Sequence, residues 1–169
     1  AGIGVTMVFM PSTPVASRYR EFSDSKQEVS LLKDLLGRIS PDVIGIGVMT
    51  NYFKRAAHIT RQIQKDCNAP VVFGGIHATV CPEECLEYAD MVCIGESEET
   101  MREVCDSIKK PHERAMIRGL CYKERGRIIK NEIRPLRDNL DSYPFPAFST
   151  DEDYVIIRDR LERMHKDRI

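Results

Sequence analysis

The sequence predicts an α/β protein in which helices wrap both faces of a parallel sheet. Short apolar runs of strand length alternate with helical patterns between residues 5 and 110, as in chains that build parallel sheets. One run, VIGIGVM at 43–49, is apolar on both faces, which is typical of a strand buried from both sides. After Pro111 the pattern changes, and residues 117–133 predict a small peripheral antiparallel hairpin with its turn at 124–126.

Apolar spacing places each element, and residues with strong local preferences mark its ends. Residues 25–28, SKQE, form a capping box, and Pro41 follows the helical pattern that this box begins. Pro82 suits the first turn of a helix, and Pro111 ends the last helical pattern. The predicted strands cover 4–10, 43–49, 71–74 and 91–94, and the predicted helices cover 25–39, 53–63, 82–88 and 97–110.

Composition and charge exclude several classes of partner. The chain has 169 residues and a net charge of −1, so neither a nucleic acid nor an anionic membrane is an expected partner. No apolar run approaches the roughly 18 residues of a membrane span, and the N-terminus lacks the basic start of a signal peptide. Six scattered cysteines indicate reduced thiols and a cytoplasmic protein rather than a disulfide framework.

Three loops are expected to meet at one edge of the sheet. They are MTNY at 49–52, GGIHAT at 74–79 and GESEE at 95–99, and each follows a predicted strand. Ligands of doubly wound sheets bind at the carboxyl ends of the strands. The glycines of these loops either let a ligand approach the backbone or only form tight turns.

The cysteines near the second of these loops suggest a metal site as one alternative. Cys81 and Cys85 are four residues apart and would share a helix face, so together with His77 and Cys93 they suggest zinc. However, the sequence has no CxxC pair, and it lacks the CxxxCxxC of an iron–sulfur site. We therefore expect no metal ligands, and we interpret the cysteines as small buried hydrophobes.

Nucleophilic catalysis is the second alternative for the residues around the GGIHAT loop. His77 and Cys81 form a candidate pair, but no Asp or Asn is placed to orient the imidazole. The sequence also has no GxSxG elbow and no Walker loop. We expect no catalytic residue, and we expect no role for His58, His112 and His165.

Three segments resemble a known family. PDVIGIGVMTNYFKRA at 41–56, PVVFGGIHATVCPEECLEYADMVCIGESEET at 70–100 and LDSYPFPAF at 140–148 are similar to the cobalamin (vitamin B12)-binding domain of cobalamin-dependent radical S-adenosylmethionine (SAM) enzymes. The resemblance covers roughly residues 1–148. It implies a Rossmann-like (flavodoxin-like) fold that holds the corrinoid at the carboxyl ends of parallel strands.

The resemblance also implies a domain organisation and a partner. Residues 1–112 would form the cobalamin-binding domain and 113–136 a hairpin extension. Residues 137–169, with a further candidate strand at 154–157, would form a linker toward a radical SAM barrel that is absent here. The parent enzyme would use cobalamin, an iron–sulfur cluster and SAM for methyl transfer or a related radical reaction. Since CxxxCxxC is absent, the chain by itself is not expected to catalyse.

Carried over position by position, the resemblance assigns a cofactor site. Gly47, Met49 and Thr50 would line a slot for the nucleotide tail, and the pair 74–75 would let the tail pass along the backbone. Residues 76–79 would lie beneath the corrin, and 95–96 would form the last wall. His77 would hydrogen-bond loop backbone or a corrin side amide, and would neither ligate cobalt nor act as a base. The expected cofactor-binding residues are Gly47, Met49, Thr50, Gly74, Gly75, Ile76, His77, Ala78, Thr79, Gly95 and Glu96.

Three departures from the family pattern have consequences. Gly47 stands where many such domains have serine, so one hydrogen bond to the tail would be lost, about 0.5–1.5 kcal/mol. DxHxxG, which supplies the lower cobalt ligand in methionine-synthase-type domains, is absent, as is common in the radical SAM branch. AGIGVTMVFM at 1–10 resembles the family's second strand with the end of its preceding helix. The first strand would then be missing and the pocket incomplete.

The competing interpretation is a non-catalytic binding or interaction module of the flavodoxin or receiver type without a corrinoid. A receiver needs a phosphorylatable Asp at a strand end, whereas the predicted strands end in Met-Thr, Gly-Gly and Gly-Glu. A flavin site needs a phosphate loop after the first strand, for which residues 11–13 are a weak candidate. Visible colour after reconstitution with cobalamin separates the two interpretations.

Overall fold

The structure is a computed structural model that describes residues 2–11, 26–145, 153–157 and 159–164. The chain divides into two compact units. One comprises residues 39–136, and the other comprises residues 1–38 together with 137–169. Each unit is described by itself. Within the described residues, no helix is long and apolar enough to cross a membrane.

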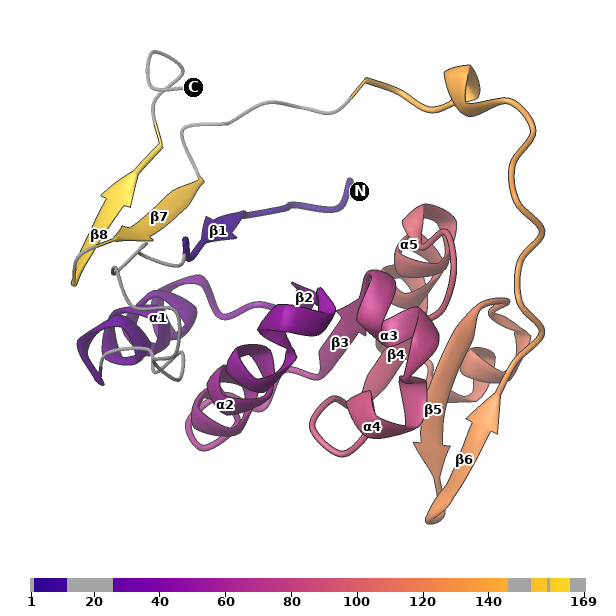
Figure 1. The fold of residues 1–169 in the computed structure, drawn as a ribbon, viewed down its shortest axis with the longest axis horizontal. Helices are drawn as coiled ribbons and strands as arrows, with labels where there is room; N and C mark the ends of the chain where they lie inside the picture. Colours follow the sequence, from indigo (N-terminus) through magenta and orange to yellow (C-terminus); the bar gives the residue numbers. More distant parts are fainter. Residues whose placement is uncertain (1, 12–25, 146–152, 158, 165–169) are drawn as a thin grey trace. The chain divides into compact units, whose positions relative to one another are not determined.

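The unit of residues 39–136 is built on a five-stranded sheet (Figure 1). Its strands, in spatial order, are β2 (Ile44–Gly47), β3 (Val71–Gly74), β4 (Met91–Cys93), β5 (Leu120–Glu124) and β6 (Arg127–Lys130). The first three are parallel, and β5 and β6 add an antiparallel hairpin to the edge at β4. The predicted α/β class, the parallel pairing of these three strands and the peripheral hairpin are confirmed.

Helices flank this sheet and close its core. They are η1 (Thr50–Tyr52), α2 (Phe53–Ile63), α3 (Ile76–Val80), α4 (Pro82–Cys85), α5 (Glu98–Ser107) and η2 (Pro111–Met116). One cluster packs Val104 of α5 against strand residues that include Met91 and Leu120. Val72, Phe73 and Val92 of the two central strands are at most 2% exposed, as expected for strands covered on both faces.

Three expectations for this unit need correction. Strand β2 was expected to be buried on both sides, but in the described residues it pairs only with β3, and its residues are half-buried or exposed. Residues 76–79 were expected to form a loop, whereas α3 is a short helix. The helix expected over 82–88 is shorter, because α4 ends at Cys85.

The second unit corrects the prediction for the N-terminal strand. Residues 4–10 were expected to belong to the parallel sheet, but β1 (Val8–Phe9) pairs in parallel with β7 (Tyr154–Ile157). Strand β7 also pairs with β8 (Arg160–Arg163), so a separate three-stranded sheet forms. Asp153 anchors it, since its carboxylate accepts a hydrogen bond from the Met7 amide at 2.9 Å. No apolar pattern in the sequence specifies this pairing, which joins residues about 150 apart.

The predicted helix at 25–39 and the candidate strand at 154–157 agree with the structure, whereas the short helix at 140–142 and the strand at 160–163 were not predicted. Helix α1 (Lys26–Ile39) buries Val29, Leu32, Leu35 and Leu36 at helical spacing. The short helix η3 (Leu140–Ser142) is capped by Asn139, whose side chain accepts a hydrogen bond from the Asp141 amide. Ser25 of the predicted capping box and residues 146–148 of the third resembling segment lie outside the described residues.

Candidate functional site

Backbone hydrogen bonds join the ends of β2 and β3. The amide of Val48, directly after β2, donates to the carbonyl of Gly74 at 2.8 Å. The carbonyl of Val48 accepts from the amide of His77 at 3.1 Å. One residue therefore connects its loop both to the end of β3 and to the first turn of α3. Since these bonds involve only backbone atoms, nothing in the sequence marks Val48 for this role.

Thr79 connects the loops that follow β3 and β4. Its hydroxyl donates to the carbonyl of Gly75 at 3.0 Å and accepts from the amide of Gly95 at 3.1 Å. The hydroxyl of Ser97 in turn donates to the carbonyl of Gly95 at 3.0 Å. The threonine of GGIHAT therefore shapes the site by joining two loops. Sequence reasoning did not include Ser97 in the site, although its position in GESEE was known.

Two glycines leave a strip without side chains at the carboxyl ends of β2 and β3. Gly47 and Gly74 are in register on these neighbouring parallel strands. A Cβ atom built on Gly47 would meet nothing within 4 Å, and one on Gly74 would meet only the Ser97 hydroxyl, at 3.9 Å. The backbone at Gly47 and Gly74 is therefore open to a neighbouring group, and their expected contact with the nucleotide tail stays a prediction.

The structure gives a different reason for a glycine at position 75 from the one that the sequence suggested. Its φ of 97° and ψ of −172° lie in a region that only glycine populates readily. A Cβ atom there would lie 3.0 Å from the carbonyl oxygen and 3.2 Å from the amide nitrogen of Val48. The absence of a side chain at Gly75 therefore lets two backbone segments approach each other, whatever ligand is bound.

Large apolar side chains are exposed beside this strip. Met49 follows β2 and is 57% exposed. Ile76 and Val80 of α3 are 61% and 69% exposed, and at a spacing of four they share one face of the helix. The sequence does not predict Val80 as part of the site, because a loop rather than a helix is expected at 76–79. Three such side chains on one edge indicate a surface for a ligand or partner.

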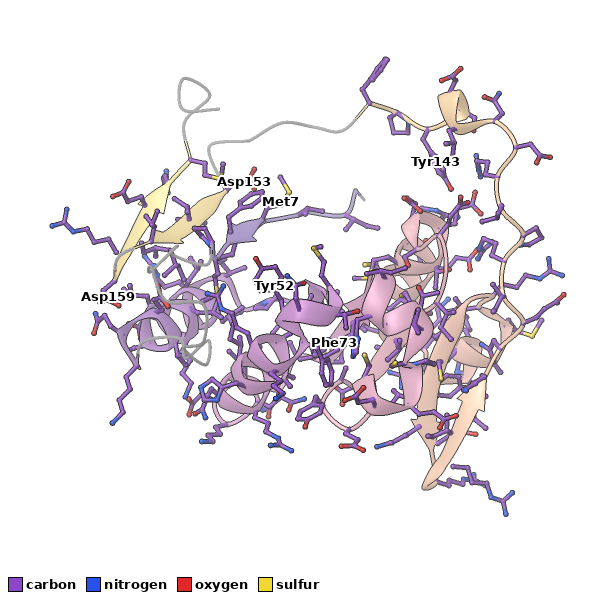
Figure 2. All side chains as sticks on the ribbon, in the orientation of Figure 1. Met7, Tyr52, Phe73, Tyr143, Asp153 and Asp159 are labelled. Atoms are coloured by element: carbon purple, nitrogen blue, oxygen red, sulfur yellow. The ribbon has the colours of Figure 1, made fainter. Side chains whose placement is uncertain are left out.

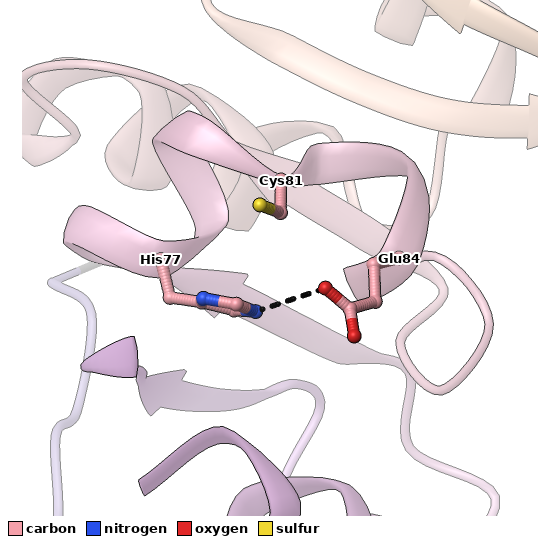
Figure 3. Close-up of side chains that lie close together, drawn as sticks. All are labelled: His77, Cys81 and Glu84. Atoms are coloured by element: carbon pink, nitrogen blue, oxygen red, sulfur yellow. Dashed lines mark ion pairs between the residues drawn. The ribbon is translucent and has the colours of Figure 1, made fainter. Parts of the chain in front are cut away.

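His77 points away from the exposed face of α3. The residue is 5% exposed, and its ring stacks on Phe53 with a centroid distance of 4.3 Å. Nδ1 lies 3.4 Å from the Thr50 hydroxyl, and Nε2 lies 3.4 Å from Oε2 of Glu84 (Figure 3). The imidazole thus contacts α2 and α4. The expected hydrogen bond from His77 to loop backbone or to a corrin side amide therefore stays a prediction, and the side-chain neighbours of the ring are Thr50 and Glu84.

The other predicted site residues differ in how far they are exposed to solvent. Ala78 is fully buried and contributes to packing. Thr50 is exposed next to Met49, while Gly95 and Glu96 are half-buried at the end of β4. Figure 2 shows the wider setting of side chains, with Phe73 in the sheet that carries these loops.

Three of the six cysteines match the expectation of small buried hydrophobes, since Cys85, Cys93 and Cys121 are buried and the other three are half-buried. All six are free. Burial raises the pKa of Cys85 to about 11 and that of Cys93 to about 12, so both are protonated thiols at neutral pH. Cys81 is half-buried, like Cys67 and Cys105, and it lies beside His77 and Glu84. Of the set considered for zinc, His77 and Cys81 belong to the group of converging ligand atoms among the described residues, which they form with Glu84 and not with Cys85 or Cys93.

Comparisons with known structures show the fold of this chain. TsrM from Kitasatospora setae, a radical SAM methyltransferase solved with cobalamin and a 4Fe-4S cluster bound, matches with a TM-score of 0.57 and 21% identity over 66% of this chain and 22% of its own. OxsB, a cobalamin-dependent SAM radical enzyme solved with aqua-cobalamin and SAM bound, matches with a TM-score of 0.56 and 23% identity over 64% of this chain and 16% of its own. The Rossmann-like fold is therefore confirmed.

Sequence comparison identifies the family. An uncharacterized methyltransferase of Pyrococcus horikoshii is 36% identical over 148 residues, a match covering 79% of this chain and 32% of that protein. The chain thus spans about a third of the length of this curated relative. The model of the B12 binding domain matches residues 21–105, which is half of the 169 residues. With this match and the fold described above, the chain belongs to the B12-binding domain family.

Proposed function

We propose that this chain binds cobalamin at the carboxyl edge of its parallel strands. The observation that supports the proposal most directly is the strip at Gly47 and Gly74, where added Cβ atoms would meet open space. A corrin ring with a nucleotide tail needs backbone that it can approach closely. The exposed side chains of Met49, Ile76 and Val80 add an apolar surface next to that strip. Apolar walls with few polar groups are typical of cofactor sites.

The residues of the site have separable tasks in this proposal. Gly47 and Gly74 admit the nucleotide tail beside the sheet. Ile76 and Val80 cover the apolar part of the corrin and exclude water from it. Thr79 keeps the two loops at a constant separation through its two hydrogen bonds. Bound cobalamin would supply a cobalt centre able to carry a methyl group.

We further propose that the domain serves a larger enzyme that transfers methyl groups together with a radical SAM domain. The names of the similar proteins, which include methyltransferases and cobalamin-dependent radical SAM enzymes, support this proposal. The chain covers only a part of each of them, so the iron–sulfur cluster and SAM would be bound by a domain of the same parent protein. Six free thiols favour a reducing, cytoplasmic location.

Reconstitution with cobalamin tests the binding. The purified chain is incubated with hydroxocobalamin and separated from free ligand by gel filtration, and cobalamin bound per chain is measured from its visible absorbance. We expect the wild-type chain to retain colour and Gly47→Leu to lose it, because the new side chain would fill the strip. Since a Cβ at Gly47 has no neighbour within 4 Å, this variant should unfold at the wild-type temperature.

The matched control is Gly37→Leu, at an exposed glycine of α1 whose added Cβ also has no neighbour within 4 Å. It should bind cobalamin like the wild-type chain. A folded wild-type chain that emerges colourless would contradict the proposal. Retention of a flavin instead would favour the flavodoxin-like alternative. Equal colour in Gly47→Leu and Gly37→Leu would show that the ligand does not occupy the strip.

A further inference from the structure

Three potential metal ligands converge where α3 joins α4. They are the imidazole of His77, the thiol of Cys81 and the carboxylate of Glu84, and their ligand atoms all lie within 4.8 Å of one another (Figure 3). Nε2 of His77 and Oε2 of Glu84 are 3.4 Å apart. All three residues come from a stretch of eight, at the junction of α3 and α4. They lie in one unit of the chain, so their arrangement is set by local structure.

The backbone holds these residues in place. The amide of Cys81 donates to the carbonyl of His77 at 2.8 Å, and the carbonyl of Cys81 accepts from the amide of Cys85 at 3.1 Å. Pro82 disfavours a helical conformation at Cys81, whose φ of −126° and ψ of 57° interrupt the helix. The chain therefore changes direction at Cys81, and α4 presents Glu84 to the imidazole. Such a junction arranges the three ligands before any ion arrives.

The imidazole of His77 has one nitrogen that lacks a hydrogen-bond partner among the described residues. Nε2 of His77 is buried, and within the described part of the chain it makes no hydrogen bond, because its approach to Glu84 lacks the required geometry. The other nitrogen, Nδ1, faces the Thr50 hydroxyl at 3.4 Å. A proton on Nδ1 can be donated to that hydroxyl, which leaves the lone pair of Nε2 directed toward Cys81 and Glu84. This is the usual arrangement of a metal-bound histidine, in which a neighbouring group holds the second nitrogen.

We propose that His77, Cys81 and Glu84 bind one zinc ion, with water in the fourth position. Nitrogen, thiolate and carboxylate donors together suit zinc, and three protein ligands plus water are typical of an open tetrahedral site. Tetrahedral zinc separates such ligand atoms by about 3.4–3.6 Å, so a contraction of about 1 Å from the present spacing is sufficient. The thiol of Cys81 loses its proton to solvent as the zinc–sulfur bond forms.

The exposure of the three residues is consistent with this site. Cys81 is half-buried, and the side chain of Glu84 is 51% exposed, so an ion has a path from solvent. The alternative is a simple ion pair between His77 and Glu84, in which Cys81 has no part. The two arrangements make opposite predictions for removal of the thiol. The site does not require cobalamin, so it is tested on the chain without that ligand.

Zinc titration of the metal-free chain, in competition with a chromophoric zinc chelator, gives the affinity and the number of ions bound. We expect one tightly bound ion per chain, released protons on binding, and a rise in the melting temperature. Cys81→Ser and Glu84→Gln should each weaken binding by at least about tenfold. Cys67→Ser removes another half-buried thiol and should leave the affinity unchanged. His77→Gln removes the ring that packs against Phe53, so its folding is checked by circular dichroism.

Substitution by cobalt(II) adds a readout specific to the thiol. A thiolate–cobalt charge-transfer band should appear in the wild-type chain and in Cys67→Ser, and should be absent in Cys81→Ser. Failure of the folded wild-type chain to retain zinc would overturn the proposal. Equal affinity in the wild-type chain and Cys81→Ser would overturn it as well and would favour the simple ion pair. Because Glu84 is half-exposed, Glu84→Gln should fold normally, so its affinity remains informative if the other variants unfold.

Discussion

Replacement of Gly75 by alanine tests the close approach between the loops after β2 and β3. The conformation of Gly75 belongs to a region whose occupation by other residues is unfavourable by about 1–3 kcal/mol. The new Cβ would also lie 3.0 Å and 3.2 Å from backbone atoms of Val48. Those atoms cannot shift freely, because they are hydrogen-bonded to Gly74 and His77. Overpacking of this kind contributes a further 1–3 kcal/mol or so. We therefore expect Gly75→Ala to lower the free energy of unfolding by about 2–6 kcal/mol.

The assay is urea unfolding followed by circular dichroism, with Gly74→Ala as the matched control. Gly74 has no positive φ, and its Cβ would meet only the Ser97 hydroxyl at 3.9 Å. Its replacement should change the free energy of unfolding by no more than about 1 kcal/mol. If Gly75→Ala and Gly74→Ala were equally stable, the close approach to Val48 would not constrain the fold and our explanation of the Gly-Gly pair would be wrong.

Three further outcomes are expected. Gly47→Ser should raise cobalamin affinity about two- to tenfold in the absorbance titration, since a serine hydroxyl can donate one hydrogen bond to the tail; weaker binding would contradict the placement of the tail. Thr79→Val, which loses two hydrogen bonds, should lower the free energy of unfolding by about 1–3 kcal/mol in urea, whereas Thr79→Ser should keep most of it. Burial raises the pKa of Cys85 to about 11 and of Cys93 to about 12 from 9.0, so the unfolded chain loses these protons first. The stability that these two protonated thiols contribute should therefore be complete below pH 9 and be lost as the pH rises toward their raised pKa values. If the free energy of unfolding decreased with pH equally steeply in Cys93→Ala, burial of this thiol would not be the cause.

Much of the fold was predictable because local preferences and tertiary packing agree. The apolar runs at 71–74 and 91–94 are buried strands, and the helical stripe at 53–63 is α2. Long-range pairing was less predictable. Residues 8–9 join residues 154–155 in a second sheet, and their apolar pattern fits either sheet equally well. A periodic pattern indicates which face of a strand is buried but does not name its neighbour.

The sequence by itself determined the α/β class, the loops at one edge of the sheet and, through GGIHAT, the resemblance to cobalamin-binding domains. Only the tertiary structure decided what each residue of that motif contacts. Gly75 lies against the backbone of Val48, Thr79 joins two loops, and His77 is buried beside Cys81 and Glu84. The physical reason is that the contacts of Gly75 and Thr79 depend on where backbone atoms of other segments lie, while that of His77 depends on how the chain turns between α3 and α4. Backbone hydrogen-bonding groups are the same in every residue except proline, so side-chain identity alone does not reveal which backbone atoms are contacted.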